Sequence, residues 1–269
     1  MDAEHLVVIG DARNMRELPA SSVQLIVTSP PNLNFRLAGP EGNGYLNDFE
    51  SYLKGLMGVF SECKRVLEPG RFLCINLSDS ASNIEKMPIP AHIIFAVRRS
   101  GFRFCEDVFW SRTAKNTAIS GRQTTLFDNK AHLSDDFQIQ RTLIFSKGLP
   151  RKSRRLKGEC GMDSHGAAVF CRNGPVRYLQ DLDARSPMPN PDIFPEEMVE
   201  SLILHFSDEG DIILDPFLGD GMLPKVASHL NRRSAGYESN PYNMRIIRQK
   251  AGIPDGHLKI IFQGEGRLT

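Results

Sequence analysis

Two short segments carry residue types that could do chemistry, and each of them follows an apolar run. The first is Thr28-Ser29-Pro30-Pro31, in which a hydroxyl side chain stands before two consecutive prolines. Prolines fix the backbone and have no N–H, so their carbonyl oxygens face no competing local donor. With Ser29 Oγ, these oxygens would form a rigid set of acceptors for an NH2 group. A plain strand-ending turn is the simpler interpretation of the same residues.

The second segment is the glycine turn Asp215-Pro216-Phe217-Leu218-Gly219-Asp220-Gly221, which lies between a predicted strand and a predicted helix. Glycines allow a sharp bend and a close approach of the backbone to a ligand. Open α/β sheets bind their ligands at the carboxyl ends of the strands. Glu238 ends the next predicted strand, where a carboxylate suits ribose hydroxyls. A glycine turn alone is weak evidence, but the strand and the acid together predict a nucleotide-like cofactor site.

Alternating strands and amphipathic helices are predicted to position these two segments. Apolar runs predict strands at 23–28, 71–77, 103–110, 139–146, 211–215 and 234–238. Helical spacing predicts helices at about 49–68, 90–100, 194–206, 223–231 and 241–251. Asn47 or Asp48 is expected to cap the first helix and Pro69-Gly70 to stop it. The alternation predicts an α/β fold with a mostly parallel, Rossmann-like sheet and helices on both faces.

A basic, weakly periodic region follows the middle strands, at 147–190, and we interpret it as a recognition insertion rather than an independent domain. Its densest cations are Arg151, Lys152, Arg154, Arg155 and Lys157. Such a run is either a solvated loop or a phosphate-binding patch that gains affinity by releasing counterions from nucleic acid. The second interpretation predicts DNA contacts.

The bulk composition is that of a globular protein. Over 269 residues it has 41% hydrophobic and 24% charged residues and a net charge of +1, so the chain as a whole is not a polycation. The sequence contains no apolar run long enough for a bilayer and no basic signal-peptide start, which predicts a cytoplasmic protein. The five cysteines form no CxxC pair. Cys160, His165 and Cys171 are poorly spaced for zinc, so we expect no metal.

Taken in order, the motifs resemble the β-class amino-methyltransferases of DNA, in which the catalytic motif precedes the cofactor motif. The matching segments are Gly10-Asp11-Ala12, Leu18-Pro19, Ser22-Val23, the Thr28–Pro31 turn, Arg65–Gly70, Trp110-Ser111-Arg112, Phe194-Pro195, Asp215-Pro216-Phe217 with Gly219 and Gly221, and Arg232-Arg233 before Ala235–Glu238. They extend over most of the chain. Each motif alone is weak evidence, and the resemblance rests on the order and spacing of the motifs.

The resemblance implies a seven-stranded methyltransferase sheet, S-adenosylmethionine as methyl donor without a metal, and double-stranded DNA with a flipped target base. It divides the chain into a catalytic half (1–110), the last strands with a target-recognition insertion (111–190), and a cofactor-binding half (191–269). The catalytic residues it implies are Ser29, Pro30, Pro31 and Asn32. The cofactor-binding residues it implies are Asp11, Ala12, Thr28, Phe194, Asp215, Pro216, Phe217, Gly219, Asp220, Gly221, Glu238 and Ser239.

Roles follow from the same resemblance. Asp11 is expected to contact the cofactor adenine and Glu238 its ribose, with Phe194 and the glycine turn near the methionine end. The family motif is (D/N/S)PP(Y/F/W), and serine in its first position is typical of enzymes that methylate cytosine N4. Ser29 therefore favours N4 of cytosine, with N6 of adenine as the alternative. A prokaryotic or phage restriction-modification system, with a companion endonuclease, is the implied setting.

Two departures from the family pattern suggest other interpretations. Asn32 stands where the family has an aromatic ring, a position that Phe35 or Tyr45 could fill instead. The cofactor turn continues as Gly-Asp-Gly-Met-Leu, where Gly-Ser-Gly-Thr-Thr is usual, so Asp220 adds a negative charge near the cofactor. These departures leave open a DNA-binding homologue with little or no activity. Amino-methylation of RNA or of a small molecule is a third hypothesis.

Overall fold

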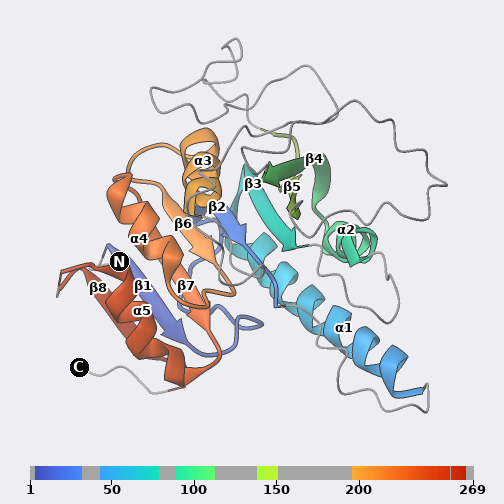
Figure 1. The fold of residues 1–269 in the computed structure, drawn as a ribbon, viewed down its shortest axis with the longest axis horizontal. Helices are drawn as coiled ribbons and strands as arrows, with labels where there is room; N and C mark the ends of the chain where they lie inside the picture. Colours follow the sequence, from blue (N-terminus) through green and yellow to red (C-terminus); the bar gives the residue numbers. More distant parts are fainter. Residues whose placement is uncertain are drawn as a thin grey trace, which may run out of the picture.

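The computed structural model describes residues 4–31, 43–78, 89–112, 138–150, 196–254 and 256–264, and these form one sheet with helices on both faces (Figure 1). The strands are β1 (His5–Ile9), β2 (Val23–Thr28), β3 (Leu67–Ser78), β4 (Arg103–Arg112), β5 (Gln138–Ser146), β6 (Ile212–Asp215), β7 (Arg233–Glu238) and β8 (Leu258–Phe262). Their order across the sheet is β4-β5-β3-β2-β6-β7-β1-β8.

The sheet is mostly parallel, as predicted. Among the described strands, β5 alone runs against its neighbours, because it pairs antiparallel with both β3 and β4. The described sheet has eight strands, one more than the resemblance implies. The strand pattern missed β1 and β8, which are five residues each and lie side by side. Length alone does not explain this, because the four-residue β6 was predicted; none of the β8 residues is fully buried, so β8 shows no continuous apolar run.

Five α-helices of the described chain cover the two faces of the sheet. They are α1 (Asn43–Val66), α2 (Ile89–Arg99), α3 (Glu196–Phe206), α4 (Met222–His229) and α5 (Met244–Ala251), the last preceded by the 3-10 turn η2 (Pro241–Asn243). One apolar cluster contains α1 and α2, and the other contains α3, α4 and α5 (Figure 1). Alternate residues of β2 serve the two clusters, with Ile26 in the first and Leu25 and Val27 in the second. The central strand is therefore buried on both sides.

Both predicted boundaries of the first helix need correction. The helix begins at Asn43, before the expected cap at Asn47 or Asp48, because Asn43 and Gly44 are residue types that favour a turn and give no sign of a helix start. It ends at Val66, and Pro69-Gly70 lies within β3 rather than in a turn that stops a helix. The register between β2 and β3 jumps at this point, and Gly70 has a φ of 82°. The Pro-Gly pair thus forms a bulge in a strand, where glycine tolerates the left-handed backbone.

The strand order brings distant parts of the sequence to one edge. Strands β2, β6, β7 and β1 are neighbours in that order and run parallel. Their carboxyl ends therefore meet along one edge of the sheet, although β2 and β6 are far apart in sequence. None of the helices in the described ranges is long and apolar enough to cross a membrane.

Candidate active site

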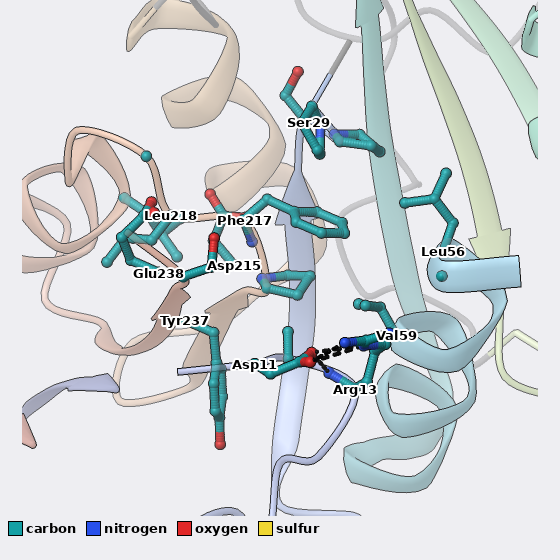
Figure 2. A pocket seen from close by; sticks show the side chains of 18 of the residues that line it. Asp11, Arg13, Ser29, Leu56, Val59, Asp215, Phe217, Leu218, Tyr237 and Glu238 are labelled. Atoms are coloured by element: carbon teal, nitrogen blue, oxygen red, sulfur yellow. Dashed lines mark hydrogen bonds and ion pairs between the residues drawn. The ribbon is translucent and has the colours of Figure 1, made fainter. Parts of the chain in front are cut away.

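A cavity of about 960 Å³ lies at this edge, between the carboxyl ends of the four strands and helix α1 (Figure 2). Most of the residues that the sequence singles out line it. They are Asp11 and Ala12 after β1, Ser29, Pro30 and Pro31 after β2, Asp215, Pro216, Phe217, Gly219 and Asp220 at and after β6, and Glu238 and Ser239 at the end of β7. Figure 2 shows Ser29 at one end and Asp11 at the other, with Asp215, Phe217 and Glu238 between them. We call Ser29–Pro31 the acceptor end, and Asp11, Asp215–Gly221 and Glu238 the nucleotide end.

Other predicted site residues are not part of the lining. Thr28 is completely buried beneath it, and Gly221 lies behind it at the start of α4. The catalytic candidate Asn32 and the cofactor candidate Phe194 fall outside the described residues. So do the five candidate DNA-binding cations, Arg151, Lys152, Arg154, Arg155 and Lys157.

The acceptor end is tied to the strands on both sides of it. The Ser29 hydroxyl donates a hydrogen bond to the Asn76 carbonyl of β3, at 3.3 Å. Because its proton points to that carbonyl, the lone pairs of Ser29 Oγ stay available for another donor. The neighbouring Thr28 hydroxyl donates to Asp215 Oδ1 at 2.6 Å and so joins the end of β2 to the end of β6. The two segments first identified in the sequence are therefore in contact.

Asp215 is held in an environment that opposes its charge. Burial raises its pKa to about 7, and the nearby carboxylates of Glu238 and Asp220 act in the same direction. Hydrogen bonds from Thr28 and from the Phe217 N–H, at 2.9 Å, favour the ionised form but do not outweigh burial. Both bonds reach Oδ1, and within the described chain Oδ2 has no hydrogen-bond partner. Such a site favours a ligand that brings positive charge.

The glycine turn is shaped by close packing against α5. Gly221 has a φ of 87°, and a Cβ atom there would lie 2.9 Å from Ile247 Cα. Asp220 Oδ1 accepts the Met222 N–H at 3.2 Å, which satisfies a donor in the first turn of α4. The Asp220 carboxylate also forms an ion pair with Lys250 of α5. The charge that departs from the family pattern is therefore paired, and it has a structural use.

The two remaining carboxylates of the nucleotide end are also fixed. Glu238 Oε1 accepts the Asn240 N–H at 2.7 Å, which leaves Oε2 without a partner among the described residues. Asp11 is bound by Arg13, whose Nε lies 2.8 Å from Oδ2, and this hydrogen-bonded partner lowers the pKa of Asp11. The Asp11 N–H donates to Gln263 Oε1 at 2.7 Å.

Sequence reasoning missed the wall that α1 contributes. This wall consists of Ser51, Tyr52, Gly55, Leu56 and Val59. The helical stripe predicted that Tyr52 and Leu56 are core, and both do pack with the main cluster, but they also face the cavity. Periodicity identifies the buried face of a helix without showing which part of that face borders a pocket. Arg13 was missed as well, although its place two residues after Asp11 was a usable signal.

Comparison with known proteins decides the family. The N6/N4 methyltransferase family, described as DNA methylase, matches residues 23–249. The chain belongs to this family. The type II methyltransferase M.MjaI of Methanocaldococcus jannaschii is 29% identical, over 97% of this chain and 95% of the relative. This match bears out the expected kinship with prokaryotic restriction-modification methyltransferases.

Solved structures share the fold. The protein TTHA0409 of Thermus thermophilus, in complex with S-adenosyl-L-methionine, has a TM-score of 0.70 at 24% identity and covers 97% of this chain and 100% of its own. The PvuII DNA methyltransferase, which is cytosine-N4-specific, has a TM-score of 0.62 at 16% identity, with 94% and 90% covered. The expected Rossmann-like methyltransferase fold is confirmed, and the expected methyl donor is the molecule bound in TTHA0409.

The described residues contain no group of three or more His, Cys, Asp or Glu side chains that could hold a metal ion. The candidate cluster weighed in the sequence, Cys160 with His165 and Cys171, lies outside those residues.

Proposed function

We propose that this DNA methylase transfers a methyl group from S-adenosylmethionine to the N4 amino group of cytosine in DNA. The main support is the strand order. Strands β1, β7, β6 and β2 are neighbours, so the residues suited to adenine, ribose, methionine and an amino group follow one another along one cavity. S-adenosylmethionine bound beside a target base would occupy sites for adenine, ribose, methionine and the amino group in this order.

The nucleotide end fits the cofactor in size and in charge. The whole cavity, of about 960 Å³, lies in the range of small-molecule pockets. Four carboxylates line it, and the raised pKa of Asp215 reflects a buried negative environment that a cation would relieve. Asp11 would receive the adenine amino group, Glu238 the ribose hydroxyls, and the glycine turn with Phe217 the methionine end. The cofactor would supply an electrophilic methyl group on a positively charged sulfur.

The acceptor end provides what a weakly nucleophilic amino group lacks. Ser29 Oγ and the Pro30 carbonyl would accept the two N–H bonds of the target NH2, drawing its lone pair out of conjugation with the ring. The same oxygens would stabilise the positive charge that develops on nitrogen during attack. The Ser29–Asn76 hydrogen bond supports this role, because it orients the hydroxyl as an acceptor. The chain would need no covalent intermediate with the base.

The choice of cytosine over adenine rests on Ser29 in the first position of the SPP motif. The cytosine-N4 specificity of the PvuII enzyme is consistent with this choice, although that similarity concerns the fold. N6 of adenine remains the alternative within the same site. We further propose that the base is flipped out of the duplex, that the basic run from Arg151 to Lys157 contacts DNA phosphates, and that a restriction endonuclease accompanies the enzyme.

The test is to methylate DNA with the purified protein, digest the product to nucleosides and identify the modified one by mass. N4-methylcytosine is expected with the wild-type protein, and it should form about 10²- to 10³-fold more slowly with Ser29→Ala. N6-methyladenine would move the assignment to the alternative base. Absence of any methylated nucleoside, with cofactor binding intact, would favour a DNA-binding homologue without activity.

A further inference from the structure

Tyr52 contacts the acceptor end from the α1 wall of the cavity. Its hydroxyl donates a hydrogen bond to the Pro31 carbonyl at 2.9 Å. Its ring packs against the apolar cluster under α1 and also lines the cavity. Burial raises the pKa of Tyr52 to about 12, so the hydroxyl keeps its proton at neutral pH and remains a donor.

This contact holds a segment that cannot anchor itself to its neighbours through backbone N–H groups. Pro30 and Pro31 have no N–H, so neither can anchor the turn by donating a backbone hydrogen bond. Their rings fix φ, and Pro31 also limits ψ of Pro30 to the extended region, but within that region ψ still sets the direction of each carbonyl. The Ser29–Asn76 bond holds the start of the turn on β3, and the Tyr52–Pro31 bond holds its end on α1. With both ends and both φ angles fixed, few directions remain for the Pro30 carbonyl between them.

We propose that Tyr52 is a positioning residue, which sets the direction of the Pro30 carbonyl by holding Pro31. This inference rests on the proposed function, because it assigns Tyr52 to the acceptor half of the reaction. Tyr52 does not touch the reacting atoms in this account. Loss of its hydroxyl should therefore slow methyl transfer without weakening cofactor binding.

The matched experiment compares Tyr52→Phe with Tyr242→Phe. The first variant keeps the ring and removes the donor, and the second removes a hydroxyl from a side chain that is 87% exposed on η2. With saturating DNA and cofactor, kcat of Tyr52→Phe should fall about threefold to tenfold, as expected for one neutral hydrogen bond. Its Kd for S-adenosylmethionine and its thermal midpoint should match those of the wild type. Tyr242→Phe should change none of the three.

A second measurement needs no activity. The sequence contains two Pro-Asn pairs, Pro31-Asn32 and Pro189-Asn190. Protein labelled with ¹³C at proline carbonyls and ¹⁵N at asparagine should therefore give two signals in a carbonyl–amide correlation spectrum. Tyr52→Phe should shift the carbonyl signal of one pair, because Pro31 loses its donor, and the other signal serves as the internal reference.

The outcomes separate this inference from the proposed function. A wild-type protein that binds the cofactor but methylates no DNA contradicts the proposed function, whatever Tyr52 does. An active wild type with an equally active Tyr52→Phe and unchanged carbonyl signals overturns only the positioning role. The positioning role also fails if kcat falls together with cofactor affinity and thermal midpoint, because that result describes a general packing defect.

Discussion

The two ends of the cavity are held in place by different kinds of contact. At the nucleotide end, Asp215 accepts two hydrogen bonds, Asp220 accepts one from the first turn of α4 and forms an ion pair, and Asp11 is bound by Arg13 and by Gln263. At the acceptor end, the described contacts of the proline turn are one hydrogen bond from Ser29 and one from Tyr52. The difference follows from composition, since two consecutive prolines supply no backbone donors.

This contrast explains which parts of the site can tolerate change. A position with several partners can lose or gain a group while its neighbours keep it in place, as Asp220 illustrates through Lys250. A position with a single partner is no longer held in place when that partner is lost. Substitutions at the acceptor end should therefore affect the chemical step strongly, and those at the nucleotide end should mainly affect cofactor affinity.

The largest effect is expected at Ser29. Ser29→Ala removes one of two oxygens that face developing charge, so kcat should fall about 10²- to 10³-fold. The Kd for S-adenosylmethionine, measured by calorimetry, should stay within about twofold. Ser61→Ala is the control, since Ser61 is exposed on the same α1 helix that lines the cavity. A large loss of cofactor affinity in Ser29→Ala would erase the distinction between the two ends.

The reverse pattern is expected at Glu238. Glu238→Gln keeps an oxygen for the Asn240 N–H but removes the charge that would bind the ribose. The Kd for S-adenosylmethionine should rise about tenfold to a hundredfold, the range for losing a hydrogen bond to a charged group. At saturating cofactor, kcat should change little. Glu197→Gln on the exposed side of α3 is the matched control, and an equal effect of the two variants would remove Glu238 from the site.

Cofactor affinity should also depend on pH through Asp215. Its pKa of about 7 in the free protein means that the carboxyl is largely protonated below that pH. A cationic ligand favours the carboxylate, so binding releases a proton and the Kd falls up to about tenfold per pH unit as pH rises towards 7. Above pH 7 the Kd should level off. Calorimetry in buffers of different ionisation enthalpy measures the released proton, which Asp215→Asn should abolish.

The raised pKa of Asp215 has the opposite effect on the stability of the free protein, which should fall as pH rises. An unfolded aspartate loses its proton near pH 4, whereas the folded Asp215 keeps it up to about 7. Its contribution to stability is therefore complete at low pH and is lost between about pH 4 and 7. Asp208→Asn, on an exposed loop, should leave both pH profiles unchanged. A wild-type Kd that is flat from pH 5 to 8 would contradict the raised pKa.

Much of the site was predictable from sequence because its residues lie at strand ends. The apolar runs that end at Thr28 and Asp215 are strong local signals, and the carboxyl ends of parallel strands meet at one edge. The helices on both faces followed from apolar periodicity in the same way. The local patterns did not supply the strand order, which comes from the structure.

The rest depended on contacts between distant residues. The Tyr52 hydroxyl reaches a carbonyl 21 residues away, and an apolar stripe gives no indication of a hydrogen bond at its margin. Lys250 lies 30 residues from Asp220, in a helix that reads as an ordinary amphipathic surface. A sequence pattern shows an unusual charge but does not show the partner that neutralises it. The departure at Asp220 therefore looked like a defect until the fold supplied Lys250.

The smallest effect is expected from breaking the ion pair between Asp220 and Lys250. Lys250→Met keeps the aliphatic stem and removes the charge. Both side chains are about one-third exposed, so unfolding free energy should fall by at most about 1 kcal/mol, with a thermal midpoint lower by about 2–4 °C. Asp220→Ser restores the usual family residue, whose hydroxyl can still accept the Met222 N–H. It should keep cofactor affinity within about threefold, an expectation that follows from assigning Asp220 a structural use.

The double variant Asp220→Ser with Lys250→Met sharpens the contrast between the two ends. If the two residues act only on each other, its loss of stability should be smaller than the sum of the single losses. A cofactor Kd that rises more than about tenfold in Asp220→Ser, with stability intact, would make Asp220 a ligand of the cofactor. The nucleotide end would then depend on single contacts as the acceptor end does, and redundancy would no longer explain why this chain tolerates an unusual turn.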